Sequence, residues 1–230
     1  MATRDVTTRT RVPLAIATAM AGFLGSVVAG VPAPVALLFA VAVLVHLAAN
    51  QVVASCGQRW LGARPAAQSL PLLDVGHLVL PKVTLSKWQS AVLEAWAVLP
   101  GVAAVAAGSP QCATLFVRAH TLVLVLRPLC FLGTILPDAS GVATHPRFWC
   151  TTGGIHDLVF SGHTAAALCG VLSWYHTGGT MLAAALGLAA CVCQSLCIVA
   201  TRKHYTVDVV LAWILCPLLL SYLVHSHATL

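Results

Sequence analysis

Charged residues, and acidic residues above all, are scarce in this chain. Asp and Glu together account for only six of its 230 residues, and charged residues of both signs make up 8%. A soluble domain usually carries about 25% charged residues, so this composition excludes an ordinary water-exposed globular domain. Basic residues never follow one another in more than pairs, which argues against nucleic-acid binding although the formal net charge is +6.

Metal-binding spacings of cysteine are also missing. The chain has nine cysteines, but Cys191-x-Cys193 lacks the second pair of Cys or His residues that a zinc site needs. We therefore expect no metal and no other cofactor. Most of the cysteines fall inside apolar runs, where they behave as small buried hydrophobic residues.

Long apolar runs are what the chain has instead. Hydrophobic residues make up 59% of the sequence, and the mean hydropathy is +0.92. A membrane-spanning helix needs about 20 mostly apolar residues. The sequence thus predicts an all-α fold, a polytopic membrane helix bundle of six or seven transmembrane helices. The candidate runs are 13–31, 34–54, 89–108, 114–136, 162–178, 181–200 and 206–224.

The first two runs are separated only by Val31-Pro-Ala-Pro34. They form either a tight helical hairpin or one span followed by a segment on the membrane surface. If every candidate run spans, the polar connections 55–88, 137–161 and 201–205 all lie on one face, together with the basic N-terminal arm 1–12. Three polar connections gathered on one face predict a polar site at the membrane boundary.

Asp157 begins a polar motif that ends in Ser161-Gly162-His163, immediately before an apolar run. Ser and Gly suit a helix start, where free backbone N–H groups and the helix dipole attract anions. A histidine in that first turn can contact a bound phosphate. Asp157, Ser161 and Gly162 are therefore candidate substrate-binding residues, and His163 is a candidate catalytic residue.

A second motif contains Arg202, Lys203, His204 and Asp208. His204 and Asp208 are four residues apart and share one face if the helix has begun. The carboxylate can then bind one imidazole nitrogen and leave the other as a nucleophile or base. Arg202 and Lys203 add positive charge for phosphate. About two spans separate His163 from His204, so both histidines return to the same face.

Two ionisable residues lie inside apolar runs. Arg127 is a functional-site hypothesis because intramembrane charges are costly and its planar fork suits phosphate. Glu94 needs a partner or a proton for the same reason.

At these residues the chain resembles the sphingomyelin synthase family, within the lipid phosphate phosphatase superfamily. His204-Tyr-Thr-Val-Asp208 and Asp157-x3-Ser161-Gly162-His163 carry most of the resemblance. Supporting motifs are Pro71-Leu-Leu-Asp74, Trp88 with Glu94, and Arg127 with Pro137. We place a catalytic domain at 70–225, preceded by membrane helices at 13–69 with little resemblance and followed by a short tail at 226–230. Leu73 and Ile155-His156 depart from the family pattern.

The resemblance implies a ceramide phosphotransferase, with a phospholipid donor, a ceramide acceptor and the bilayer as partners. The expected donor is phosphatidylcholine, with phosphoethanolamine and phosphoinositol as alternative headgroups, and the products are sphingomyelin or a related sphingophospholipid plus diacylglycerol. It implies that His204 forms a phosphohistidine, that Asp208 orients His204, and that His163 transfers the protons. The implied substrate-binding residues are Arg127, Asp157, Ser161, Gly162, Arg202, Lys203, Asp74 and Glu94.

Two alternatives remain, a lipid phosphate phosphatase and a catalytically inactive membrane scaffold. His120 stands where the superfamily's phosphatases have lysine, which favours the transferase. We expect a Golgi, endoplasmic-reticulum or plasma-membrane protein with a lumenal or extracellular site, and a homodimer is compatible with this reading. The excess of Lys and Arg on the same face predicts the opposite orientation.

Overall fold

The computed structural model describes residues 6–62, 72–107, 109–134, 136, 137, 139 and 159–228. These residues form helices and no strand, which confirms the all-α helical bundle. The helices are α1 (Val6–Val28), α2 (Ala33–Gly62), α3 (Val75–Val79), α4 (Lys87–Ala106), α5 (Pro110–Gly133), α6 (Gly162–His176), α7 (Met181–Ala200) and α8 (Thr206–Ala228).

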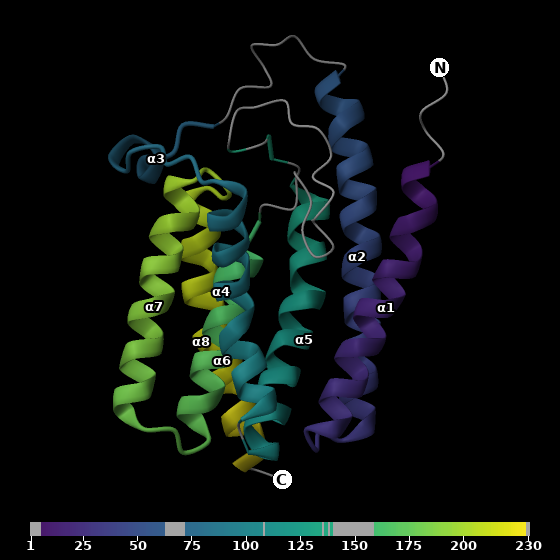
Figure 1. Cartoon of the computed structure of the whole chain (residues 1–230), viewed down its shortest axis with the longest axis vertical. Coiled ribbons are helices and arrows are strands. Elements are labelled where there is room, and N and C mark those ends of the chain that lie inside the picture. The colour runs from purple at the N-terminus through teal and green to yellow at the C-terminus, as the bar shows by residue number, and fades with distance from the viewer. Residues whose placement is uncertain are drawn as a thin grey trace.

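The long helices stand side by side, and the short helix α3 lies at one end of the bundle (Figure 1). The segment around α3 is joined there to the turn after α7, because His77 Nε2 bonds to the carbonyl of His204 at 3.1 Å. The start of α6 reaches the same end, where the Ser161 N–H donates to the carbonyl of Asp208 at 2.9 Å. The described parts of the three polar connections therefore meet at one face, as up-down counting predicted.

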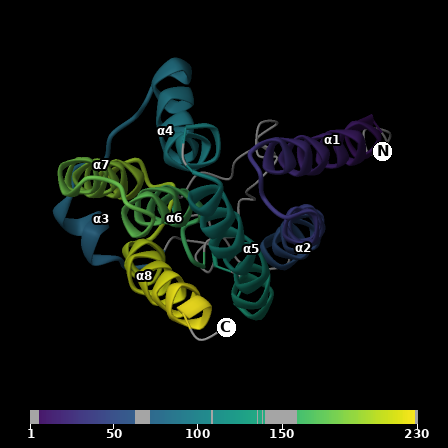
Figure 2. The same cartoon turned by 90° about the horizontal axis from the view of Figure 1, so that it is seen from below.

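Helix α6 occupies the middle of the bundle and contacts α4, α5, α7 and α8 (Figure 2). Close packing with α4 depends on glycine. A Cβ added at Gly170 would lie 2.4 Å from the carbonyl carbon of Pro100 and 2.6 Å from the amide nitrogen of Gly101. Small residues let membrane helices approach this closely, so α4 is held firmly against the helix that begins with the candidate site.

Five helical segments are long and apolar enough to cross a membrane: Ala33–Val53, Lys87–Ala106, Pro110–Gly133, Met181–Ala200 and Thr206–Ser226. Among the residues described, the apolar part of α1 is the shorter segment Ala17–Val28, and α6 has 15 residues. The total of six or seven transmembrane helices thus remains a prediction. Helices α1 and α2 pack against each other, as in a helical hairpin.

Hydroxyl side chains fix where four of the helices begin. Ser86, Ser109, Ser161 and Thr180 each accept the backbone N–H of the third residue after them, at the starts of α4, α5, α6 and α7. Such caps satisfy an amide that has no partner within the helix. Because Ser161 is the cap of α6, His163 falls in the first helical turn.

Candidate active site

His163 and His204 face each other at the end of the bundle that carries α3. Their ring centroids are 5.8 Å apart, and the ring planes are inclined by 71°. His163 comes from the first turn of α6, and His204 from the turn between α7 and α8. One phosphate group can contact two imidazoles at this separation.

Asp208 holds the His204 ring from behind. Its Oδ2 lies 3.4 Å from His204 Nδ1, at ion-pair distance, and accepts the N–H of Tyr205 at 3.0 Å. The Asp208 side chain is fully buried and that of His204 is 6% exposed. The contact is an ion-pair contact without a hydrogen bond, and a carboxylate beside Nδ1 favours the tautomer with its hydrogen there, which leaves Nε2 as the nitrogen that can react.

Glu94 is the corresponding partner of His163. Its Oε2 lies 2.5 Å from His163 Nε2, and its Oε1 accepts a hydrogen bond from the Lys203 ammonium. Lys203 Nζ also donates to Ser90 Oγ at 3.2 Å. The two imidazoles therefore each have a carboxylate of their own, and Lys203 lies in the same cluster. The sequence predicted that Glu94 needs a partner or a proton. In the structure its carboxylate has two partners, the His163 imidazole and the Lys203 ammonium.

Arg127 lies against the start of α6. Its Nε donates to the carbonyl of Phe160 at 2.8 Å, and its Nη1 lies 3.0 Å from His46 Nε2. A Cβ at position 162 would lie 2.7 Å from Arg127 Nη1, so only glycine leaves room for the guanidinium. Arg127 and Gly162 thus form one positively polarised corner beside His163.

Ser161 links two of the helices that build the site. Its hydroxyl accepts the N–H of Thr164 at 3.3 Å, and its own N–H donates to the carbonyl of Asp208. The distance between the start of α6 and the start of α8 is fixed by this bond.

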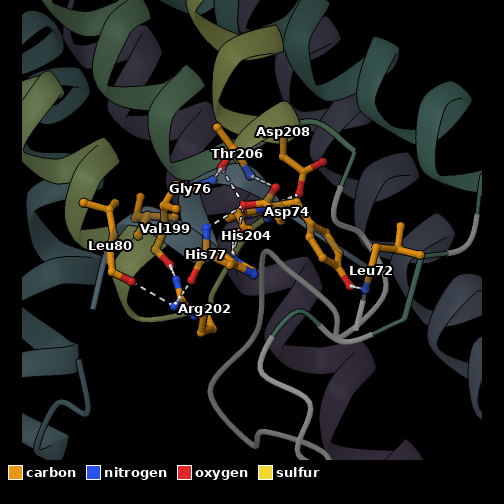
Figure 3. Close-up of polar contacts among 12 residues, drawn as sticks. Leu72, Asp74, Gly76, His77, Leu80, Val199, Arg202, His204, Thr206 and Asp208 are labelled. Atoms are coloured by element: carbon orange, nitrogen blue, oxygen red, sulfur yellow. Dashed lines mark hydrogen bonds and ion pairs between the residues drawn. The ribbon is translucent and has the colours of Figure 1, made fainter. Parts of the chain in front are cut away.

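Asp74 joins the α3 segment to the start of α8 (Figure 3). Its carboxylate accepts the N–H of Thr206 at 2.8 Å, the Thr206 hydroxyl at 2.6 Å and the N–H of His77 at 2.9 Å. Burial alone would raise the pKa of this carboxyl, but these hydrogen bonds and the nearby His77 outweigh burial and hold the pKa below 3.8. The Asp74 carboxylate thus holds the α3 segment against the start of α8. Substrate binding by Asp74 stays a prediction.

Arg202 also bonds to the protein backbone. Its guanidinium donates to the carbonyls of His77 at 2.7 Å, Leu80 at 3.0 Å and Val199 at 3.2 Å (Figure 3). Its φ of 57° lies in the left-handed region, which is uncommon for a residue with a side chain. These bonds hold the turn that presents His204, and a contact of Arg202 with substrate stays a prediction.

His77 belongs to none of the sequence motifs described above, yet it supports His204 directly. Its Nε2 bonds to the carbonyl of His204, and its ring stacks on Tyr205 with centroids 5.5 Å apart. No spacing rule links positions so far apart in the chain. An open cavity of about 380 Å³ lies at this segment, lined by Leu72, Leu73, Asp74, His77, Leu78, Lys82, Ala139 and Arg202.

Asp157 lies outside the described residues, so its predicted place at the site is not tested. Within the described part of the chain, no group of three or more His, Cys, Asp and Glu side chains is arranged to hold a metal ion.

Comparison with known proteins now bears on this site. Residues 155–226 match the family described as PAP2 superfamily C-terminal. The C-terminal third of the chain resembles this superfamily. The matched segment holds His163, His204 and Asp208, and the resemblance drawn from the sequence is confirmed there.

Curated relatives match a part of the chain of similar length. The chain is 41% identical over 69 residues to phosphatidylinositol:ceramide inositolphosphotransferase 3 of Arabidopsis thaliana, covering 30% of this chain and 24% of the relative. It is 43% identical over 60 residues to phosphatidylinositol:ceramide inositolphosphotransferase of Oryza sativa subsp. indica, covering 26% and 18%. The chain thus matches a quarter or less of the length of these relatives. No solved structure gives a significant match.

Proposed function

We propose that this protein is a membrane phosphotransferase that moves a phospho-headgroup from a glycerophospholipid to the primary hydroxyl of ceramide. The observation that carries the proposal is the pair of histidines 5.8 Å apart, one contacting Glu94 and the other Asp208. The names of the curated relatives that match part of this chain support ceramide as the acceptor.

In the first step, His204 Nε2 attacks the donor phosphorus and forms a phosphohistidine. The bond from phosphorus to the diacylglycerol oxygen breaks, and protonated His163 gives that oxygen its proton. Asp208 stabilises the positive charge that develops on the His204 ring. Since Glu94 contacts His163 Nε2, the proton transferred is the one on Nδ1.

In the second step, the ceramide hydroxyl attacks the phosphohistidine. His163, now neutral, removes the hydroxyl proton while the bond between phosphorus and His204 breaks. Both histidines return to their starting protonation states. In the first step Glu94 partly offsets the burial that disfavours protonated His163.

Charge on the phosphate oxygens is stabilised by Arg127 and by the first amides of α6. Arg127 Nη1 lies 2.7 Å from the position that a Cβ at Gly162 would take, so the guanidinium and the first amides of α6 lie at the same corner of the site. Preorganised donors of this kind stabilise the charge that spreads over the equatorial oxygens during transfer.

Two donors are proposed for a direct comparison. Phosphatidylinositol ranks first because the curated relatives that match part of this chain are named for it. Phosphatidylcholine, which would give sphingomyelin, follows from the broader resemblance of the sequence motifs. The site is proposed to face the lumen or the exterior, in a Golgi, endoplasmic-reticulum or plasma membrane. A protease-protection assay on a C-terminal tag would test that orientation.

The purified protein, incorporated in vesicles with ceramide and each labelled donor, provides the test. We expect a sphingophospholipid and diacylglycerol in equal amounts by mass spectrometry, and none from the His204→Ala variant. Release of the headgroup phosphate to water without a ceramide product would identify a phosphatase instead. Unchanged lipids in both samples would favour the inactive scaffold.

A further inference from the structure

His46 is a buried histidine that the proposed reaction does not yet use. It lies on α2, outside the residues that match the superfamily, and is 1% exposed. Helix α2 packs along α5 (Figure 1), the helix that carries Arg127. His46 Nε2 lies 3.0 Å from Arg127 Nη1.

The direction of this hydrogen bond is determined by chemistry. A guanidinium has only donors, so His46 Nε2 must be the acceptor. The imidazole is therefore neutral and carries its proton on Nδ1. Arg127 Nε donates in addition to the Phe160 carbonyl at 2.8 Å, and two bonds to partners on different elements fix the guanidinium plane.

Phe131 completes the support around this pair. Its ring meets the His46 ring edge-on, with centroids 5.6 Å apart and an angle of 73°. Arg127 Cζ lies 5.9 Å from the same Phe131 ring centroid. The ring of Phe131 is fully buried, so neither His46 nor Arg127 can reorient without disturbing the packing between α2 and α5.

We propose that His46 is a positioning residue, which holds the Arg127 guanidinium at the start of α6 where the donor phosphate binds. This inference rests on the proposed function, because it takes Arg127 as a phosphate-binding group. It makes α2 part of the reacting unit, although α2 lies outside residues 155–226, which match the superfamily.

The test compares His46→Leu, which removes the acceptor, with His46→Gln, whose amide oxygen can accept the same bond. His176→Leu is the matched control, since His176 is exposed and ends α6 at the far side of the bundle. Diacylglycerol release from labelled phosphatidylinositol and phosphatidylcholine is measured for each full-length variant. This readout counts the first step whether ceramide or water accepts the phosphate.

We expect His46→Leu to lower kcat by about 10- to 100-fold, taking as the scale the loss seen when the outer partner of a metal-ligating side chain is removed. His46→Gln should lose clearly less, and His176→Leu should match the wild type. A His46→Leu variant within about twofold of the wild type would overturn the inference. A His46→Gln variant with a kcat as low as that of His46→Leu would also overturn it, because the loss would then come from changed packing and not from the lost hydrogen-bond acceptor.

A double-mutant cycle with Arg127→Ala separates positioning from general stability. If His46 acts through Arg127, adding His46→Leu to Arg127→Ala should lower kcat no further. Fully additive losses would refute the coupling. Diacylglycerol release without a ceramide product would refute the proposed transferase, but the mutant cycle could still be measured. A wild type that releases no diacylglycerol would refute both the proposed function and the role of His46.

Discussion

Gly162 offers the sharpest test of how the phosphate corner is built. A Cβ at this position would lie 2.7 Å from Arg127 Nη1 and 2.9 Å from Cζ. Restoring ordinary contact at 3.4 Å requires a movement of about 0.7 Å, the difference between 3.4 and 2.7 Å. The guanidinium is held by Phe160 and His46, so that movement strains or breaks one of its hydrogen bonds.

Two effects of Gly162→Ala follow from this geometry. Losing a buried hydrogen bond to a charged group costs about 1.5–3 kcal/mol of unfolding free energy. A misplacement approaching 1 Å at a reacting centre can cost about 100-fold in rate. We therefore expect Gly162→Ala to lower kcat for diacylglycerol release by about 10- to 100-fold, with a moderate loss of thermal stability.

Two comparison variants isolate the local effect. A Cβ at Gly133, on the same helix as Arg127, meets nothing within 4 Å, so Gly133→Ala should behave as wild type. Gly170→Ala places its Cβ against the backbone of α4 and lowers stability away from the phosphate corner. If Gly162→Ala keeps the wild-type kcat, or if Gly170→Ala loses as much activity at equal stability, the reasoning about Arg127 is refuted.

Three further predictions concern the carboxylates of the site. Asp208→Asn should lower kcat by about 10²- to 10⁴-fold while the protein remains folded by thermal unfolding, because His204 loses its tautomer control; phosphohistidine trapping would check this, and normal trapping would contradict it. Glu94→Gln should lower kcat and move the alkaline limb of the pH–rate profile to lower pH, because neutral Gln no longer favours the protonated His163 that acts as the acid; an unmoved alkaline limb would contradict the pairing. The pKa of Asp74 lies below 3.8 in the folded protein, so the stability from its carboxylate is complete above that pH and is lost as the pH falls through the folded pKa. Thermal unfolding from about pH 6 to about pH 3 should therefore show the wild type losing its advantage over Asp74→Asn in acid, and a constant difference would contradict it.

Local sequence rules predicted the parts of the site that adjoin one another in the chain. His204 and Asp208 lie one helical turn apart, and Ser161 was recognisable as a cap before an apolar run, so their local geometry followed from helix periodicity. Up-down counting then placed His163 at the same face. Those steps need only the lengths of apolar runs and the polarity of the connections between them.

Contacts between distant helices were beyond those rules. Glu94 meets His163 across 69 positions, and His46 meets Arg127 across 81. Sequence spacing says that each intramembrane charge needs a partner but not which one. Arg202 shows the converse, because its position beside His204 suggested a phosphate contact while its guanidinium bonds to three backbone carbonyls.

The depth of the site in the bundle bears on why a lipid would be the acceptor. Helix α6 has 15 residues, about 22 Å of rise, against a hydrocarbon core of about 30 Å. Glu94 lies about 10 Å along α4 from Lys87 at the helical rise of 1.5 Å per residue. Glu94, and the His163 ring that it contacts, thus lie below the level where α4 begins. A ceramide, whose polar end is small and lies near the bilayer surface, can reach such a position laterally from the membrane. The Glu94 side chain is 50% exposed and that of His163 25%, so a lipid hydroxyl and water can both reach this pair, and the product assay with ceramide distinguishes transfer from hydrolysis.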